Sequence, residues 1–382
     1  MKSWFGFIAV AVAAAAIGGW DAQASFAGTG ASAAGFDEGT GHAVFVQTDN
    51  TAGNAVVAYS RAGDGTLTEA ASYPTGGLGG VLAGSVVDHL ASQGSLVYDQ
   101  LHRLLYAVNA GSDTVSVFSV HGNRLSLSQV TSSGGTFPVS VAVHGDHVDV
   151  LNALGGGSVQ GFIVVLGHLV PLPGSNRPLG LNASATPQFT NTPGQIAFSP
   201  DGSKLIVTTK ANGNDIDVFR VGPFGYLSGT PVVTAEPGTV PFALSFDRAG
   251  NLVVAEAGTN ALASFRLNAD GTISPLTAVP TGQAATCWVE PADGRFYVSN
   301  AGSATLSGFQ SGPGGQLTLL GATPTDPGTV DAAATPDGRF LYVQTGAAGI
   351  VDAFKVNSDG SLAELGATVV PDAAGGEGIA VS

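Results

Sequence analysis

Residues 105–118 read LYAVNAGSDTVSVF, and residues 296–309 read FYVSNAGSATLSGF. The same pattern returns at five more places: an apolar run, a loop of small residues, and an alternating run that ends in an aromatic residue. The terminal aromatic residues are Tyr59, Phe118, Phe162, Phe219, Phe265, Phe309 and Phe354. Most copies are 44–46 residues apart, a spacing typical of the blades of a β-propeller.

Each repeat contains four strand-like runs with turn signals between them. A short apolar run such as GQIAFSP precedes an Asp-Gly pair at Asp201-Gly202, and a second such pair, Asp270-Gly271, follows an aromatic end. Asp-Gly between alternating runs favours a tight hairpin turn, because both central residues of that turn take positive φ. The sequence therefore predicts an all-β fold at residues 42–382, a seven-bladed β-propeller of four-stranded antiparallel blades.

The two ends of the repeat array predict how the ring closes. The array begins at a second strand, HAVFVQTDN (42–50), and the chain stops at GEGIAVS (376–382), a lone first strand. We expect the last strand to supply the inner strand of the first blade, since closure leaves no open sheet edge. Extra length falls at residues 76–93 and 171–192, which we interpret as turn-rich insertions on a regular ring.

The composition narrows the classes of function. The chain has 382 residues, of which 56 are Gly and only 11% are charged, and its net charge is -15. Nucleic acids and anionic membranes both require basic patches, so neither is expected as a partner. The single cysteine, Cys287, excludes an intrachain disulfide, and we expect it to be a buried, unreactive thiol in the apolar stretch TCWVE.

Residues 1–24 have the organisation of a secretory signal peptide. Lys2 precedes an apolar run over residues 4–17, and Ala-Gln-Ala at residues 22–24 has the small-x-small form that a signal peptidase cleaves. An uncleaved anchor is the alternative, although a bilayer span needs about 20 apolar residues. We expect a flexible leader at residues 25–41 and a secreted, monomeric protein, extracellular or periplasmic, that leaves the membrane after cleavage.

The order of the repeat segments, QIAFSPDG, FYVSN, TVSVF and an Asp-Gly turn, resembles the lactonase-like seven-bladed propellers. That family includes 6-phosphogluconolactonase and the muconate cycloisomerases known as 3-carboxymuconate cyclase. The resemblance covers about residues 43–382. It implies three inward-facing catalytic residues: a His early in one first strand, a Glu just after the second strand of that blade, and an Arg at the same place in the next blade.

The aligned repeats lack this set of residues. The first-strand column holds Ser95, Ser140, Gln195, Ala243, Thr286, Asp331 and Gly378. The column after the second strand holds Thr51, Ala110, Ala153, Ala211, Ala257, Ala301 and Gly346. The sequence therefore favours a binding or interaction protein of this family. The alternative is a lactone hydrolase or muconate cycloisomerase that uses substitute residues, and the question of whether the protein is an enzyme stays open.

A candidate ligand site comes from the preceding column, which holds Asn50, Asn109, Asn152, Lys210, Glu256, Asn300 and Thr345. We interpret the Asn residues as caps at the start of a loop. Lys210 and Glu256 break the pattern in adjacent blades and predict a salt bridge or a ligand clamp at the channel mouth. With Gln195 and Asp331 they would form a pocket for a small polar ligand, a glycan or a protein.

The turn HGDHVD at residues 144–149 is the strongest metal candidate in the sequence. It lies where the other repeats have the turn between their first and second strands. That position is on the face opposite to the site of the family. We therefore expect no metal site and no cofactor.

Overall fold

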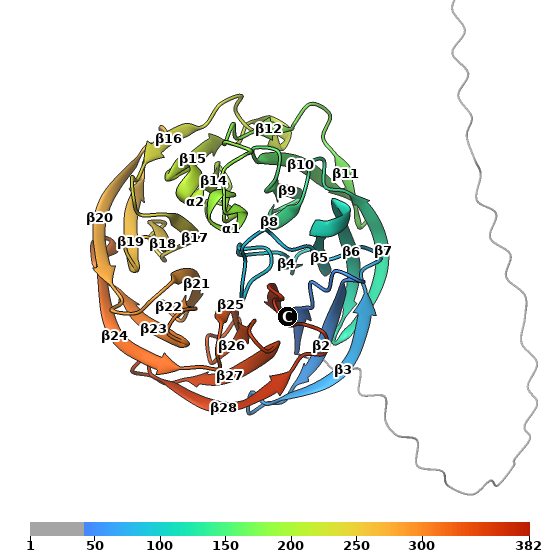
Figure 1. Ribbon diagram of the computed structural model, residues 1–382, viewed down its shortest axis with the longest axis vertical. Helices are drawn as coiled ribbons and strands as arrows, with labels where there is room; N and C mark the ends of the chain where they lie inside the picture. Colours follow the sequence, from blue (N-terminus) through green and yellow to red (C-terminus); the bar gives the residue numbers. More distant parts are fainter. Residues whose placement is uncertain (1–41) are drawn as a thin grey trace, which may run out of the picture. The chain divides into compact units, whose positions relative to one another are not determined.

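Residues 42–382 of the computed structural model form a ring of seven antiparallel sheets (Figure 1). Six sheets have four strands and one has five, which confirms the seven-bladed propeller that the repeats predict. The expected signal peptide and leader, residues 1–41, lie outside the described residues. No helix within the described part of the chain is long and apolar enough to cross a membrane.

The strands of each blade follow from the innermost outward. Blades 1 to 3 contain β29 (Ile379–Val381), β1 (Ala43–Gln47), β2 (Ala55–Arg61) and β3 (Leu67–Pro74); β4 (Leu96–Asp99), β5 (Leu104–Asn109), β6 (Thr114–His121) and β7 (Arg124–Ser132); and β8 (Pro138–His144), β9 (His147–Asn152), β10 (Ser158–Val165) and β11 (His168–Pro171), with β12 (Arg177–Pro178) also on β10. Blades 4 and 5 contain β13 (Ile196–Phe198), β14 (Lys204–Thr208), β15 (Asp215–Arg220) and β16 (Val232–Ala235), then β17 (Pro241–Phe246), β18 (Leu252–Glu256), β19 (Ala261–Leu267) and β20 (Ile273–Pro280). Blades 6 and 7 contain β21 (Thr286–Ala292), β22 (Arg295–Asn300), β23 (Thr305–Ser311) and β24 (Leu317–Pro324), then β25 (Thr329–Ala334), β26 (Phe340–Thr345), β27 (Ile350–Val356) and β28 (Leu362–Val369). The short helices are α1 (Gln188–Asn191) and α2 (Lys210–Gly213), with 3₁₀ turns η1 (Ala110–Ser112), η2 (Pro223–Gly225) and η3 (Pro313–Gly315).

The aromatic residue that ends each repeat lies on the third strand of its blade, and all seven are buried. Phe118 of blade 2 belongs to the same buried cluster as Phe45 of blade 1, and Phe354 of blade 7 shares a cluster with Tyr297 of blade 6. Burial of one such side chain contributes roughly 1.5–3 kcal/mol. The repeated aromatic residues therefore hold each blade against its neighbour.

The Asp-Gly turns also connect neighbouring blades. The hydroxyl of Tyr342 donates a 2.8 Å hydrogen bond to the carbonyl oxygen of Gly65, in the next blade, where φ is 93°. A Cβ atom at Gly65 would collide with the ring of Phe340. These turns join first to second and third to fourth strands, so antiparallel pairing places them on one face of the ring, the turn face. The loops between second and third strands lie on the opposite face, the loop face.

The C-terminal strand closes the ring as predicted. β29 pairs with β1, with Ile379 opposite Val46, and the Ser382 N–H donates to the carbonyl oxygen of Ala43 at 3.0 Å. This pairing covers the inner edge of β1, which would otherwise expose unpaired backbone groups.

Deletion of residues 379–382 should destabilise the whole ring, because it removes β29 and exposes the edge of β1. We expect the melting temperature to fall by about 10 °C or more, measured by circular dichroism on the otherwise full chain. An unchanged melting temperature would show that the first blade is stable without its inner strand.

The first insertion, residues 76–93, crosses the centre of the ring, where it is the blue coil in Figure 1. We call it the axial segment. Leu82 and Leu90 within it are fully buried, and the His89 N–H donates to the carbonyl oxygen of Gly375 at 2.8 Å. The segment is turn-rich as predicted, but the prediction is incomplete, because Leu82, Asp88 and residues 90–93 are buried in the ring while Leu78, Val81 and Val86 are exposed.

The second insertion, residues 171–192, supplies β12 and α1. Its Gln188 side-chain oxygen accepts a 2.9 Å hydrogen bond from the Ala83 N–H of the axial segment. The two insertions thus contact each other on the loop face of the ring.

Candidate binding sites in the central channel

The axial segment is attached to blade 6 through its last two residues. The Gln93 side chain donates to the carbonyl oxygen of Val289 and accepts from the Val289 N–H, both at 3.0 Å. The indole N–H of Trp288 donates to the carbonyl oxygen of Ser92 at 2.6 Å. A buried backbone must find such partners, since an unpaired buried polar group costs about 1–3 kcal/mol.

Blades 3 and 1 hold the same two residues from other sides. Ser140 Oγ donates to the carbonyl oxygen of Gln93 at 2.6 Å, and Ser92 Oγ donates to that of Val139 at 2.9 Å. Oε2 of the Glu377 carboxyl group, just before β29, lies 3.2 Å from the same Ser92 Oγ. Because the axial segment is bonded to blades on several sides of the ring, it fills the middle of the channel.

The axial segment divides the channel into two cavities. The turn-side cavity, about 520 Å³, has Gln93 in its lining together with the inner strands and the Ser199-Pro200 turn. The loop-side cavity, about 250 Å³, has Val87 and Ala91 in its lining, with residues of blades 4, 5 and 6.

Lys210 is buried under the loop-side cavity and acts as a structural anchor. Its Nζ donates to the carbonyl oxygens of Ala91 and Phe189, at 2.6 and 2.7 Å, and to Thr192 Oγ1 at 3.1 Å. Nζ also lies 5.2 Å from the centroid of the Phe242 ring. Three acceptors match the three protons of an ammonium group, so Lys210 connects the axial segment and the second insertion to blade 4.

The negative charge of Asp88, in the axial segment, attracts the positive charge of Lys210. The two side chains are not close enough to form an ion pair within the described residues. Its carboxylate accepts from three consecutive backbone N–H groups, at residues 90–92. Burial raises the pKa of Asp88 to about 6 and lowers the pKa of Lys210 to about 7, and the attraction between the two opposes both shifts.

Replacing Lys210 by Met should destabilise the fold, because the change leaves two buried carbonyl oxygens without a donor. We expect a loss of roughly 2–5 kcal/mol in the free energy of unfolding, measured by urea denaturation. Lys355→Met, at an exposed position of β27, is the control and should change it by less than about 0.5 kcal/mol. Equal stability of the two variants would contradict the anchoring role.

The predicted salt bridge between Lys210 and Glu256 is not formed. Glu256 Oε2 accepts from Thr259 Oγ1 at 2.8 Å, and the hydrogen bonds of the Lys210 ammonium go elsewhere. Burial raises the pKa of Glu256, and the charge of Glu236 raises it further. The Glu256 side chain therefore lies beside other acidic groups and not beside Lys210.

Strand pairing explains this error, because it corrects the alignment of the repeats. The loop after β14 is one residue longer than the equivalent loop in blade 2, so Thr209 takes the column position that we gave to Lys210. In blade 1 the position belongs to Thr48 instead of Asn50. A bulge in β21 moves Trp288 into the first-strand column in place of Thr286.

The predicted capping role of the Asn residues is not observed at Asn109, whose side chain makes no capping hydrogen bond to η1. The Asn109 side-chain amide donates to Thr114 Oγ1 and Ser116 Oγ, and that of Asn300 donates to Thr305 Oγ1 and Ser307 Oγ. Each amide thus joins the end of a second strand to the third strand of its own blade.

Gln195 and Asp331 both line the turn-side cavity, whereas Lys210 lines the loop-side cavity and Glu256 lines neither. The four predicted residues therefore do not form one pocket. Gln195 Oε1 accepts from the Leu244 N–H at 2.6 Å, and its amide nitrogen has no protein acceptor in residues 42–382. Asp331 Oδ1 accepts from the Ala332 N–H at 2.9 Å.

Two further acidic residues belong to the channel and escaped the sequence analysis. Glu290 lines the turn-side cavity and accepts from the Ala334 N–H at 2.8 Å. Burial raises the pKa of Glu290 to about 8, and it raises that of Asp331 to about 7. Glu377 is fully buried, its pKa is well above the usual range, and its carboxyl is hydrogen-bonded to Asp331. Carboxyl groups of this kind keep a proton near neutral pH and can donate hydrogen bonds.

Stability should therefore fall as the pH rises. The pKa of Glu290 is about 8 in the folded protein, against 4.5 when unperturbed. The protonated Glu290 therefore contributes to the free energy of unfolding in full below pH 4.5, and this contribution is lost as the pH approaches 8. Glu290→Gln keeps the shape but cannot ionise, so its melting temperature should fall less between pH 5 and pH 8 than that of the native chain. Exposed Glu69→Gln on β3 is the control. Parallel curves for the native chain and Glu290→Gln would contradict the assignment.

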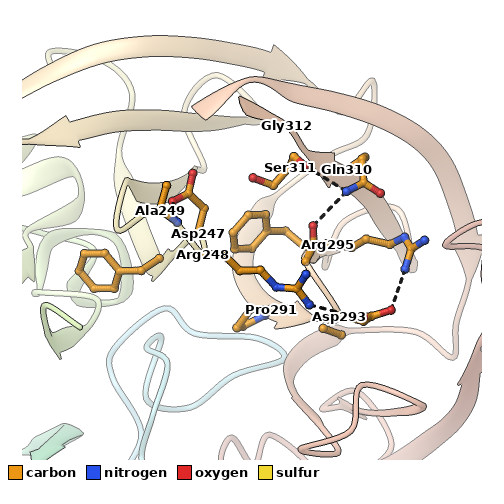
Figure 2. Close-up of a pocket in the computed structure, with 13 residues that line it drawn as sticks. Asp247, Arg248, Ala249, Pro291, Asp293, Arg295, Gln310, Ser311 and Gly312 are labelled. Atoms are coloured by element: carbon orange, nitrogen blue, oxygen red, sulfur yellow. Dashed lines mark hydrogen bonds and ion pairs between the residues drawn. The ribbon is translucent and has the colours of Figure 1, made fainter. Parts of the chain in front are cut away.

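A third cavity, about 400 Å³, lies at the turn face between blades 5 and 6 (Figure 2). Arg248 and Arg295 both pair with Asp293, at 3.1 and 3.4 Å, and Arg295 also donates to the carbonyl oxygen of Ser358 at 2.5 Å. The charges in this groove are compensated within the protein. We therefore interpret it as a contact between blades 5, 6 and 7.

The histidine-rich turn does not gather ligands for a metal. Asp146 pairs with His102 Nε2 at 3.0 Å, while His102 Nδ1 lies 2.6 Å from Asp99 Oδ2. His144 instead lies against Phe198, with 5.7 Å between ring centroids. Across residues 42–382, no group of three His, Cys, Asp or Glu side chains is arranged to hold a metal ion.

Cys287 is buried and free, as expected. Burial raises the pKa of its thiol to about 12. The reactive form of cysteine is the thiolate, so this residue is a protonated, unreactive part of the wall of the loop-side cavity.

Comparison with known proteins supports the resemblance at the level of the fold. No protein-family model matches the sequence, and no curated protein matches it. Among solved structures, a Bacteroides fragilis protein provisionally ascribed as a 6-phosphogluconolactonase has a TM-score of 0.71 and 18% identity, covering 91% of this chain and 99% of that one. The periplasmic gluconolactonase of Pseudomonas aeruginosa has a TM-score of 0.69 and 18% identity, covering 89% and 98%.

A functionally unknown protein from Desulfotomaculum acetoxidans has a TM-score of 0.66 and 15% identity, covering 90% of this chain and 99% of that one. The chain therefore has the fold of the lactonase-like seven-bladed β-propellers. Because one fold supports many functions, likeness at this level of identity does not transfer a reaction.

Proposed function

We propose that the protein is an exported, ligand-binding propeller of lactonase-like fold that does not hydrolyse lactones. The axial segment carries this proposal. It occupies the loop side of the channel, where the resemblance would place a catalytic His, Glu and Arg. A substrate in that position would have to displace the buried Leu90 and the hydrogen bonds of Ser92 and Gln93.

The corrected columns support the same view. Once corrected, the column just after the second strands, where the resemblance implies the Glu and the Arg, holds Asp49, Ala110, Ala153, Lys210, Ala257, Ala301 and Gly346. Neither His nor Arg occurs at these positions or in the first-strand column. The two charged residues at these positions are bonded within the protein, because Lys210 donates to three protein acceptors and Asp49 Oδ1 accepts from the Gly80 N–H.

We infer that the ligand is a small, uncharged, polyhydroxylated molecule bound in the turn-side cavity. Gln195, Asp331 and Glu290 offer both donors and acceptors there, as a polar ligand needs. No Lys or Arg lines this cavity, and the net charge of -15 would repel an anion. A glycan end has the same chemistry, whereas a protein partner would contact the exposed turns instead.

A hydrolase acting in the turn-side cavity is the second candidate, because Glu290 and Asp331 have pKa values of about 8 and 7, in the range useful for proton transfer. Hydrolysis of a lactone also develops negative charge on the carbonyl oxygen, which donors or cations must stabilise. The cavity lining contains no Lys or Arg, so no cation of the lining stabilises that charge. We therefore favour binding over catalysis.

Activity separates the two candidates. The purified protein should hydrolyse glucono-δ-lactone and 6-phosphogluconolactone no faster than the uncatalysed background, followed by pH-stat titration. Turnover of about 1 per second or more that is abolished by Glu290→Gln would establish the hydrolase instead.

Binding is tested by calorimetry with neutral sugars and glucono-δ-lactone. Gln195→Ala and Asp331→Ala should weaken binding of any ligand found by about tenfold or more, because each removes a polar group from the turn-side cavity. Gln316→Ala, at an exposed position, is the control and should leave the affinity unchanged. Export is part of the proposal, and the intact mass of the secreted chain should begin at Ser25.

A further inference from the structure

We propose that the loop-side cavity is a second binding site, for a small, uncharged, single-ring compound with one hydroxyl group, of which phenol is the simplest. This site is separate from the polar turn-side cavity and does not depend on the function proposed for it. The cavity has a volume of about 250 Å³. An apolar cavity of about 150 Å³ already holds benzene, so a ring with small substituents fits.

The polar groups around the cavity are nearly all engaged within the protein. The three protons of the Lys210 ammonium have acceptors, the Trp288 indole N–H donates to Ser92, and the Asp88 carboxylate accepts three backbone N–H groups. A buried water needs two to four polar partners. Since the walls offer too few, the cavity favours an apolar occupant over water.

One polar atom is the exception. Ser85 is a lining residue of the cavity, and its Oγ is buried behind the cavity surface with no hydrogen-bond partner in the described part of the chain. An unpaired buried hydroxyl costs about 1–3 kcal/mol, so rotation of the Ser85 side chain toward a hydrogen-bonding group of a ligand in the cavity would be favourable. This atom selects a ligand with a single hydroxyl over a pure hydrocarbon.

The walls favour a ring. Phe242 and Trp288 both line the cavity, with ring centroids 4.9 Å apart and an angle of 60° between their planes. Aromatic side chains in such tilted arrangements stabilise a further ring by edge and face contacts. Ala257 and Ala301 are the first residues after β18 and β22. Their small side chains leave the space between these aromatic residues and the axial segment unfilled.

The axial segment also provides a way in. Val86 lines the cavity, yet it is 82% exposed, unusual for a valine beside an apolar pocket. Phe189 of α1 lines the same cavity. Exposed apolar side chains beside a pocket mark a site of contact with apolar molecules, and here they lie where a ligand would enter.

The test is titration of the full chain with phenol and with toluene, followed by fluorescence and by calorimetry. We expect saturable binding of both, with a Kd for phenol of about 1 mM or lower. Trp288 lines the site, so the change in fluorescence should disappear in Trp288→Phe while the heat of binding remains. Ser85→Ala should weaken the binding of phenol about three- to tenfold, and it should change the Kd of toluene less than twofold.

Two variants that fill the cavity make the result specific. Ala257→Leu and Ala301→Leu each occupy the space of the ligand and should weaken phenol at least tenfold. Ala52→Leu adds the same volume at an exposed loop of blade 1 and should leave binding unchanged. Circular dichroism identifies the variants that fold. The test needs only one of the two filling variants to be folded.

Three results would overturn the proposal. The first is the absence of saturable binding up to about 10 mM, a concentration above which contacts are unspecific. The second is undiminished binding of phenol by a folded filling variant. The third is a loss of phenol affinity in Gln195→Ala as large as that in the filling variants, which would place the ligand in the turn-side cavity.

Discussion

The structure depends on how a buried segment of irregular backbone satisfies its polar groups in the centre of the ring. The axial segment has no strand or helix to pair its N–H and carbonyl groups, and water does not reach its last residues. The ring supplies the partners instead: the side chains of Lys210, Trp288 and Ser140 bond to three successive carbonyl oxygens, at residues 91–93. Side chains that resemble a catalytic or binding set are therefore used for structure.

The ring itself could be predicted from the sequence because its information is local and repeated. Each Asp-Gly turn and each terminal aromatic residue specifies one hairpin, and seven copies agree with one another, so an error in a single copy does not change the fold. Closure also followed from the repeat, because the chain contains one first strand too many at its end and one too few at its beginning. Single-residue differences were not predictable in this way: the longer loop at Thr209 and the bulge before Trp288 shift an alignment without altering the pattern of strands.

The channel could be predicted only in part, since its contacts join residues far apart in the sequence. The insertion at residues 76–93 was identified from its length, but its path across the ring was not. Leu82 and Leu90 were the available signal, because apolar residues in a turn-rich insertion indicate burial. Gln195 and Asp331 line the turn-side cavity, apart from Lys210, and their role in ligand binding stays a prediction. Glu290 lies two positions beyond Trp288 and outside both aligned columns, so the comparison of these columns could not draw attention to it.

The likeness of the ring to the lactonase-like propellers and the difference of its channel are compatible for a physical reason. The blades are held together by buried side chains between neighbouring sheets, such as Phe118 with Phe45, and these contacts do not involve the channel. Each blade contacts mainly its neighbours, so the ring is stable whether the centre is open or filled. An insertion between two blades can therefore fill the centre at little cost to the ring. In this chain it produces two cavities of opposite character, one polar and acidic and one apolar, with a single segment as their common wall.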